Sequence, residues 1–312
     1  MKRFVRDMLL KLCFVLAVIP PAVPSVTQAA DKLKVVATFS VIGDMVSVVA
    51  GEHVALSVLV GPDGDTELFK PSLADGKSVA EANIIFMNGL NDEFEPWLEP
   101  LLSQVNFTGV KTVVSRGAKT LTAAEEHSIS GKLLPAALDQ HAWLDLRNGI
   151  VYVKNIAETL ARQDAANAAD YKARAAAYVK ELHELDAWAR AEMAAVPPAK
   201  RRVIASHDSL EYLSKAFGVT MITLNGWTNA SEPSAAELAQ LTKQIRQEHI
   251  RALFIDSITD PRAIEQVAKE AGATIGGKLY GDALSKPDGE AGSYIKMIRH
   301  DIMTLKAGML QD

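Results

Sequence analysis

Cysteine is almost absent from this sequence, which has one, Cys13, in 312 residues. A single thiol excludes a disulfide framework and any cysteine-rich zinc module. Aromatic residues make up only 6%, and the net charge of −5 leaves no basic excess of the kind that marks nucleic-acid-binding proteins. An acidic balance instead suits a protein that attracts cations. The 48% of hydrophobic residues is enough to bury a core, which excludes a long disordered chain.

Long apolar runs are missing as well, except near the N-terminus. Residues 12–26 form one such run, which follows a basic stretch and precedes small residues at 29 and 30. This is the pattern of a secretory signal, and the run is too short for a comfortable membrane span. We therefore expect residues 1–29 to be a cleaved signal peptide, rather than an uncleaved anchor helix, and the mature protein to be periplasmic. Cys13 lies inside the run without small residues before it, so we expect no lipid anchor there.

Removal of residues 1–29 takes away four basic residues and one acidic residue, which changes the net charge from −5 to −8. The mature chain then has no cysteine, which avoids thiol chemistry in an oxidising compartment. No later run reaches the roughly 18 apolar residues that a membrane-spanning helix needs.

Short runs rich in valine and isoleucine alternate with helical patterns along the rest of the chain. The expected strands are 33–40, 54–60, 83–87, 111–114, 202–206, 219–224, 252–255 and 274–280. The expected helices are 41–50, 72–82, 149–163, 165–195, 209–217, 234–248, 261–271 and 292–309. This alternation predicts an α/β protein with mainly parallel sheets and crossover helices in two halves.

Residues 165–195 contain neither glycine nor proline and carry one apolar stripe, made of Tyr171, Ala175, Tyr178, Leu182, Leu185 and Trp188. The pattern predicts a helix of roughly 45 Å. Its regularity also predicts limited hinge motion, because a bend in a helix needs an identifiable break. The expected organisation is an N-terminal lobe at 30–164, a linking helix at 165–196 and a C-terminal lobe at 197–312.

Imidazole and carboxylate side chains follow several predicted strands or turns. His207 and Asp282 come just after strands, His141 lies beside a turn, and Glu67 lies in a turn-rich stretch. In open α/β sheets, ligands bind outside the carboxyl ends of the strands. A mixed nitrogen and oxygen donor set suits Zn²⁺, Mn²⁺ or Fe²⁺.

Four segments carry a more specific signal. They are Gly-Pro-Asp-Gly-Asp-Thr-Glu-Leu-Phe-Lys-Pro-Ser at 61–72, Asp-Gln-His-Ala-Trp-Leu-Asp at 139–145, Ser-His-Asp-Ser-Leu-Glu-Tyr-Leu at 206–213 and Leu-Tyr-Gly-Asp-Ala-Leu-Ser at 279–285. In this order they resemble the solute-binding proteins of zinc and manganese ABC transporters, the cluster A-I metal receptors. The resemblance covers nearly the whole mature chain. It implies two lobes joined by one long helix, with a metal held in the cleft.

The resemblance assigns metal-ligand roles to position 67, His141, His207 and Asp282. Relatives usually carry histidine at the first position, where this chain has Glu67. Three interpretations of this departure compete. Glu67 binds the metal and shifts the preference toward Mn²⁺ or Fe²⁺; or it pairs with Lys70 and leaves three protein ligands; or the chain binds metal poorly.

The remaining candidates have simpler interpretations. Asp208 either caps the helix after His207 or accepts a hydrogen bond from a metal ligand and orients it. His127 lies where zinc-specific relatives often carry a His-rich loop, and we interpret it as part of a solvated loop. Structural or surface roles are expected for His53, His183, His249 and His300, and packing roles for Trp143 and Trp227.

The main functional hypothesis is a binding protein rather than an enzyme. It would capture a divalent transition metal (zinc, manganese or iron) outside the cytoplasm, as a monomer, and deliver it to the membrane permease of an ABC importer. One alternative is a periplasmic metalloenzyme, although the sequence has no His-Glu-x-x-His pair, Gly-x-Ser-x-Gly elbow or phosphate loop. The other alternative is a receptor for a chelated metal such as an iron-siderophore.

Overall fold

The computed structural model of the protein describes residues 32–90, 92–122, 138–223 and 234–311. The expected signal peptide, His127 and Trp227 lie outside these described residues. Within the described ranges, no helix combines the length and the apolar character needed to cross a membrane.

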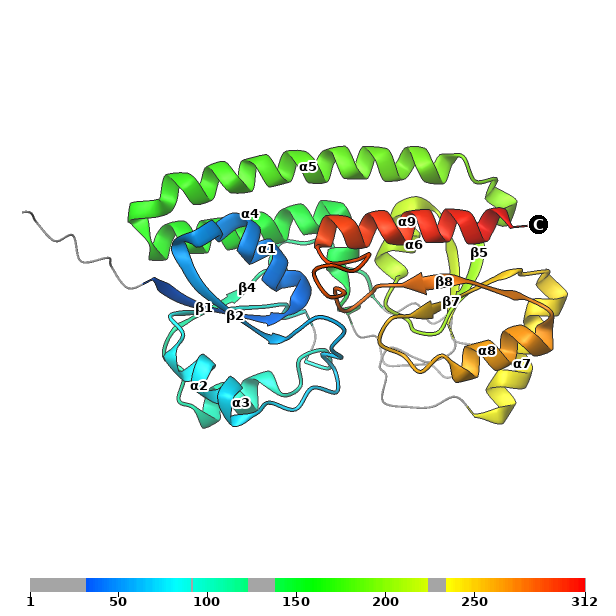
Figure 1. Cartoon of the computed structure of the whole chain (residues 1–312), viewed down its shortest axis with the longest axis horizontal. Helices are drawn as coiled ribbons and strands as arrows, with labels where there is room; N and C mark the ends of the chain where they lie inside the picture. Colours follow the sequence, from blue (N-terminus) through cyan, green and yellow to red (C-terminus); the bar gives the residue numbers. More distant parts are fainter. Residues whose placement is uncertain (1–31, 91, 123–137, 224–233, 312) are drawn as a thin grey trace, which may run out of the picture. The chain divides into compact units, whose positions relative to one another are not determined.

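The first half of the chain is built around a sheet of four parallel strands in the order β2-β1-β3-β4. Its strands are β1 (Leu33–Phe39), β2 (Val54–Val60), β3 (Ile84–Met87) and β4 (Val110–Val113). Its helices are α1 (Ser40–Ala50), α2 (Leu73–Glu81), α3 (Leu98–Gln104) and α4 (Leu146–Gln163). Figure 1 shows α1 and α4 on one side of this sheet and α2 and α3 on the other. Because the sheet is covered on both faces, its strands consist mainly of apolar residues.

The second half repeats this plan with four parallel strands in the order β6-β5-β7-β8. Its strands are β5 (Arg202–Ala205), β6 (Thr220–Thr223), β7 (Ala252–Asp256) and β8 (Thr274–Leu279). Its helices are α6 (Glu211–Phe217), α7 (Ala235–Glu248), α8 (Arg262–Ala271) and α9 (Tyr294–Leu310). Short 3₁₀ helices occupy Gly51–His53, Ala142–Leu144, Ala165–Asn167 and Pro198–Lys200. The prediction of two parallel sheets flanked by helices is confirmed.

The long helix α5 (Ala168–Ala194) has 27 residues and is about 40 Å long. It packs on α1 and α4 of the first half and on α6 and α9 of the second (Figure 1). The predicted stripe is buried as far as Leu185. Beyond that point the burial continues through Ala189 and Met193, while Trp188 is partly exposed beneath the Arg299 guanidinium.

Buried aromatic side chains connect the two halves. Trp143 is fully buried, and its ring centroid lies 4.9 Å from that of Phe39 and 5.1 Å from that of Phe94. Its indole Nε1 donates to Gly281 O at 2.9 Å, and Tyr294 Oη donates to Trp143 O. The predicted packing role of Trp143 is therefore confirmed, and it joins the α4 region to segments that follow β8.

Gly149 in α4 is required by the close approach of Tyr294 from α9. A Cβ at this position would lie within 3.0 Å of Tyr294 Cζ. We expect Gly149→Ala to destabilise the fold by about 1–3 kcal/mol, because the overpacked ring has to move. Gly76→Ala is a matched control, since its Cβ would have no heavy atom closer than 3.7 Å. That variant should gain roughly 0.5–1 kcal/mol, because alanine loses less backbone entropy in a helix. Urea unfolding measures both, and equal stability of the two variants would contradict the account.

Candidate metal centre

Glu67 lies in the turn-rich segment between β2 and α2. The segment is held by the Trp97 indole, which donates to Thr66 O at 2.8 Å, and by Leu68 N, which donates to Asp65 Oδ1 at 3.0 Å. Glu67 is buried, with 7% exposed, whereas the adjacent Leu68 is 53% exposed. The local backbone therefore directs the carboxylate inward.

His141 immediately precedes the 3₁₀ turn that leads into α4. Its ring Nδ1 donates to Asp139 Oδ1 at 2.8 Å, and its backbone N–H donates to the same oxygen at 2.9 Å. A carboxylate on Nδ1 fixes the ring and its tautomer, and leaves Nε2 as the coordinating nitrogen. His141 is fully buried.

His207 and Asp282 follow the ends of β5 and β8, as the sequence predicts. Gly281 has to be glycine, because a Cβ there would lie 2.6 Å from Ser209 Cβ. The segment after Asp282 is held by the first half of the chain: Leu284 N donates to Ser40 Oγ at 2.9 Å, and Asp63 N donates to Leu284 O at 2.8 Å. Asp282 is thereby brought to the segment that carries Glu67.

The structure brings all four predicted ligands together. Glu67, His141, His207 and Asp282 each offer one donor atom, and these four atoms lie within 4.8 Å of one another. Asp282 is central, with Oδ1 3.1 Å from His141 Nε2 and Oδ2 3.2 Å from His207 Nε2. Neither Asp282 oxygen and neither Nε2 has a partner with hydrogen-bond geometry among the described residues. Buried polar atoms are normally paired, so their convergence without hydrogen bonds fits a bound cation.

The ionisable groups of the site shift one another's pKa values. Burial disfavours the imidazolium forms, but the Asp282 carboxylate outweighs it, raises the pKa of His207 to about 9 and raises that of His141 well above its ordinary value. Burial alone would raise the pKa of Asp282, but the two imidazoles hold it below its ordinary value. In the metal-free protein this site therefore carries protons that a metal has to displace.

The family assignment follows from the sequence as a whole. Residues 35–308 match the model of the ZnuA family, described as zinc-uptake complex component A, periplasmic. The chain belongs to this family. The resemblance inferred from the four motifs is thus confirmed.

Relatives of the ZnuA family differ in the metal that their names carry. The chain is 30% identical over 284 residues to the manganese ABC transporter substrate-binding lipoprotein PsaA of Streptococcus pneumoniae, with 90% of each chain covered. It is 32% identical over 287 residues to the iron ABC transporter substrate-binding lipoprotein MtsA of Streptococcus pyogenes, with 91% of each covered. The periplasmic zinc binding protein TroA from Treponema pallidum superposes with a TM-score of 0.81 at 28% identity, over 90% of this chain and 100% of that one.

Within this member of the ZnuA family, sequence reasoning missed two side chains of the site. Asp139 orients His141, and Gln140 Nε2 donates to Glu67 Oε1 at 2.6 Å. Both are fully buried. The only signal was their position next to His141, because the contact with Glu67 spans 73 residues of sequence.

The interpretation that pairs Glu67 with Lys70 finds no support. Lys70 is exposed, whereas Glu67 is buried. Glu67 instead receives a hydrogen bond from a neutral amide, which does not neutralise its charge.

Asp208 does not cap the helix that follows His207. Helix α6 begins at Glu211 with Leu210 as N-cap and no side-chain cap, so the capping interpretation is wrong. Burial and the nearby Asp139 carboxylate raise the pKa of Asp208 to about 7, although His207 and His141 oppose this shift. A role in orienting a ligand stays a prediction. Asp256, whose pKa burial raises to about 6, also interacts electrostatically with His207.

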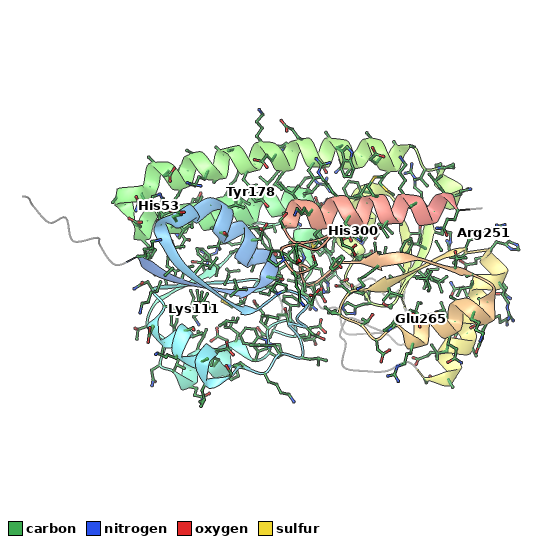
Figure 2. All side chains as sticks on the ribbon, viewed as in Figure 1. His53, Lys111, Tyr178, Arg251, Glu265 and His300 are labelled. Atoms are coloured by element: carbon green, nitrogen blue, oxygen red, sulfur yellow. The ribbon has the colours of Figure 1, made fainter. Side chains whose placement is uncertain are left out.

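The other described histidines have structural or surface surroundings, as predicted. His53 pairs with Asp170 of α5 at 2.6 Å, and His300 Nε2 lies 2.9 Å from Lys278 O; both histidines are labelled in Figure 2. His249 is the left-handed C-cap of α7, and His183 lies on the exposed face of α5.

Proposed function

We propose that this chain is the extracytoplasmic substrate-binding component of an ABC importer for a divalent transition metal. The observation that carries the proposal is the convergence of two imidazoles and two carboxylates, from both halves of the chain, on one buried point. Membership of the ZnuA family supports it, and so do the relatives PsaA, MtsA and TroA, whose names carry manganese, iron and zinc.

The proposed ligands are Glu67, His141, His207 and Asp282. Two neutral imidazoles and two carboxylates give a set with a formal charge of −2, which balances a divalent ion. Carboxylate oxygen suits Mn²⁺, imidazole suits Zn²⁺, and two imidazoles combined with carboxylate form a donor set that Fe²⁺ also accepts. With Glu67 in place of the histidine expected from the resemblance, the set shifts toward Mn²⁺ and Fe²⁺.

The proposed organisation follows the division of the chain by α5. Residues 1–29 would be removed as a signal peptide, lobes 30–164 and 197–312 would contribute two ligands each, and 165–196 would link them. The receptor would act in the periplasm as a monomer, bind no nucleic acid, and hand the metal to a membrane permease. Because α5 is unbroken over 27 residues, we expect release to need only a small movement of a lobe or of the loops that carry the ligands.

The geometry favours this function over the two alternatives. A metalloenzyme needs an open coordination position beside a general base. Here the four ligand residues are at most 7% exposed. A chelated metal would bring its own donor atoms, and four convergent protein donors within 4.8 Å would then serve no purpose. The site suits a bare ion.

The test is metal content. The mature chain 30–312, stripped with chelator, is offered equimolar Zn²⁺, Mn²⁺ and Fe²⁺ under anaerobic conditions, and elemental analysis follows desalting. We expect one equivalent of a divalent metal per chain. The share of Mn²⁺ or Fe²⁺ in the bound metal should be larger than a site with histidine at position 67 would retain. Absence of retained metal would refute the receptor function and direct attention to chelated metals.

A further inference from the structure

Gln140 is placed to orient the carboxylate of Glu67. Its side-chain Nε2 donates to Glu67 Oε1 at 2.6 Å, and both residues are buried. Gln140 also immediately precedes His141, so one short segment supplies a metal ligand and the hydrogen-bond donor that contacts a second ligand.

The backbone that carries Gln140 is held by the side chains of Asn88 and Tyr212. Asn88 Nδ2 donates to Gln140 O at 2.8 Å, and Tyr152 Oη donates to Asn88 Oδ1 at 2.5 Å. Tyr212 Oη donates to the preceding carbonyl, Asp139 O, at 3.0 Å. Because Asn88 and Tyr212 donate to main-chain oxygens, a substitution of the Gln140 side chain leaves both hydrogen bonds in place.

The orientation of the Gln140 amide is dictated by Glu67. The amide oxygen Oε1 is buried and has no hydrogen-bond partner among the described residues. A flipped amide would point this oxygen at the Glu67 carboxylate, where two acceptors would repel each other. The protein therefore leaves one buried acceptor unpaired in order to direct the amide N–H groups at the carboxylate, which is unfavourable unless the carboxylate has a function there.

We propose that Gln140 is a positioning residue that makes Glu67 a one-oxygen metal ligand and thereby sets the preference among divalent metals. This inference rests on the proposed function. The amide engages one carboxylate oxygen, which opposes bidentate coordination and fixes the rotamer of Glu67. Unlike a lysine or arginine, a neutral donor does not cancel the negative charge that attracts the metal. An outer-shell hydrogen bond of this kind tunes ligand orientation and basicity.

The proposal is tested by a double-mutant cycle with Gln140→Met and Glu67→Gln. Gln140→Met keeps the length of the side chain and removes the donor. We expect it to weaken Mn²⁺ binding by about 10–100-fold, the range for loss of an outer-shell partner. Zn²⁺ binding should weaken less, because it depends more on the two imidazoles. In the Glu67→Gln background the same substitution should change the Mn²⁺ Kd by less than roughly threefold, since no carboxylate is left to position.

Two readouts separate positioning from a general structural effect. The thermal unfolding of the metal-free variants shows whether they fold. The electron paramagnetic resonance spectrum of bound Mn²⁺ reports the ligand arrangement and should change in Gln140→Met. Gln140→Glu, which replaces the donor with an acceptor of the same shape, should weaken Mn²⁺ binding at least as much.

The outcomes distinguish this inference from the function on which it rests. Wild-type protein that binds no metal overturns the proposed function. Wild-type protein that binds metal, together with a folded Gln140→Met variant of unchanged Mn²⁺ to Zn²⁺ affinity ratio and spectrum, overturns the role of Gln140 alone. Equal losses with and without the Glu67→Gln substitution also overturn it, because they show that Gln140 does not act through the Glu67 carboxylate.

Discussion

Substitution of Asp282 by asparagine should abolish retention of metal. Asp282 approaches His141 Nε2 with one oxygen and His207 Nε2 with the other, at 3.1 and 3.2 Å. Asparagine keeps the shape, but it lowers the formal charge of the ligand set from −2 to −1 and offers a weaker donor oxygen. We expect the affinity for Mn²⁺ and Zn²⁺ to fall by more than about 100-fold, beyond the 10–100-fold cost of losing an outer-shell partner. Competition with a chelating dye measures both affinities.

The same variant should weaken the metal-free fold. Removal of one partner from a buried ion pair costs on the order of 3–5 kcal/mol when the other charge stays uncompensated. Because the imidazoles can lose their protons, we expect the loss in the free energy of unfolding at pH 7 to lie near or below the lower end of this range. Asp260→Asn is the matched control: its side chain is 55% exposed and pairs with Arg262 beyond the site. Metal binding by Asp282→Asn equal to that of Asp260→Asn would remove Asp282 from the ligand set.

The pH dependence of metal binding should be steep. In the metal-free protein burial opposes protonation, but the Asp282 carboxylate raises the pKa of His207 to about 9 and that of His141 well above its ordinary value. Both imidazoles therefore carry protons at pH 7, and a metal has to displace them. Between pH 6 and pH 8 we expect the affinity to rise roughly 10–100-fold per pH unit, which corresponds to the release of one to two protons. Calorimetry in buffers of different ionisation enthalpy counts the released protons.

The stability of the metal-free protein should change in the opposite sense. A histidine with a raised pKa stabilises the fold fully at pH values below about 6.5, the pKa of histidine in the unfolded chain. For His207 this contribution is lost as the pH rises through about 9, its pKa in the folded protein. The raised carboxyls act in the same direction: the contributions of Asp256 and Asp208 are lost as the pH rises through about 6 and about 7. Asp282, with a lowered pKa, loses its contribution only in strong acid. Urea unfolding should show a lower free energy of unfolding at pH 9 than at pH 6. A metal affinity that does not change between pH 6 and pH 8 would contradict the expected release of protons on metal binding.

Features that depend on neighbouring residues alone were predictable from the sequence. Ser72 and Ser234 cap α2 and α7 through capping boxes with Asp75 and Glu237, because N-cap and N3 are three residues apart in any sequence. The bounds of β2 match the expected 54–60. The four convergent side chains were also predictable, since the carboxyl ends of parallel strands and the motif resemblance both pointed to them.

Features that depend on tertiary contacts were not predictable. The short helix α3 was not expected, because its seven residues include Pro100 and its buried leucines belong to a core that is assembled from segments distant in the sequence. Helix α4 begins at Leu146, three residues before the prediction, although Asp145 was a visible cap that accepts from Arg147 N. The long helix begins three residues later than expected, after a 3₁₀ turn at Ala165–Asn167.

The residues that contact the ligands were the part of the site that the sequence predicted least well. Asp139 was hidden by the motif that contains it, and Gln140 is explained only by a residue 73 positions away. Asp208, which looked like a helix cap, is not one, because α6 starts later than the sequence suggests. Local patterns predict which side chains lie at the edge of a sheet, but not which of these side chains contact one another.

The placement of two ligands in each half means that the cargo would also act as a reversible crosslink. Glu67 and Asp282 lie far apart in the sequence, and a shared ion would close the loop between them just as a disulfide would. A mature chain without cysteine would thus obtain its covalent-like tie from the metal that it transports, with a stabilisation that grows with the logarithm of metal concentration. The empty receptor should then be the form that proteases degrade first, so that the abundance of the receptor follows the supply of its own cargo.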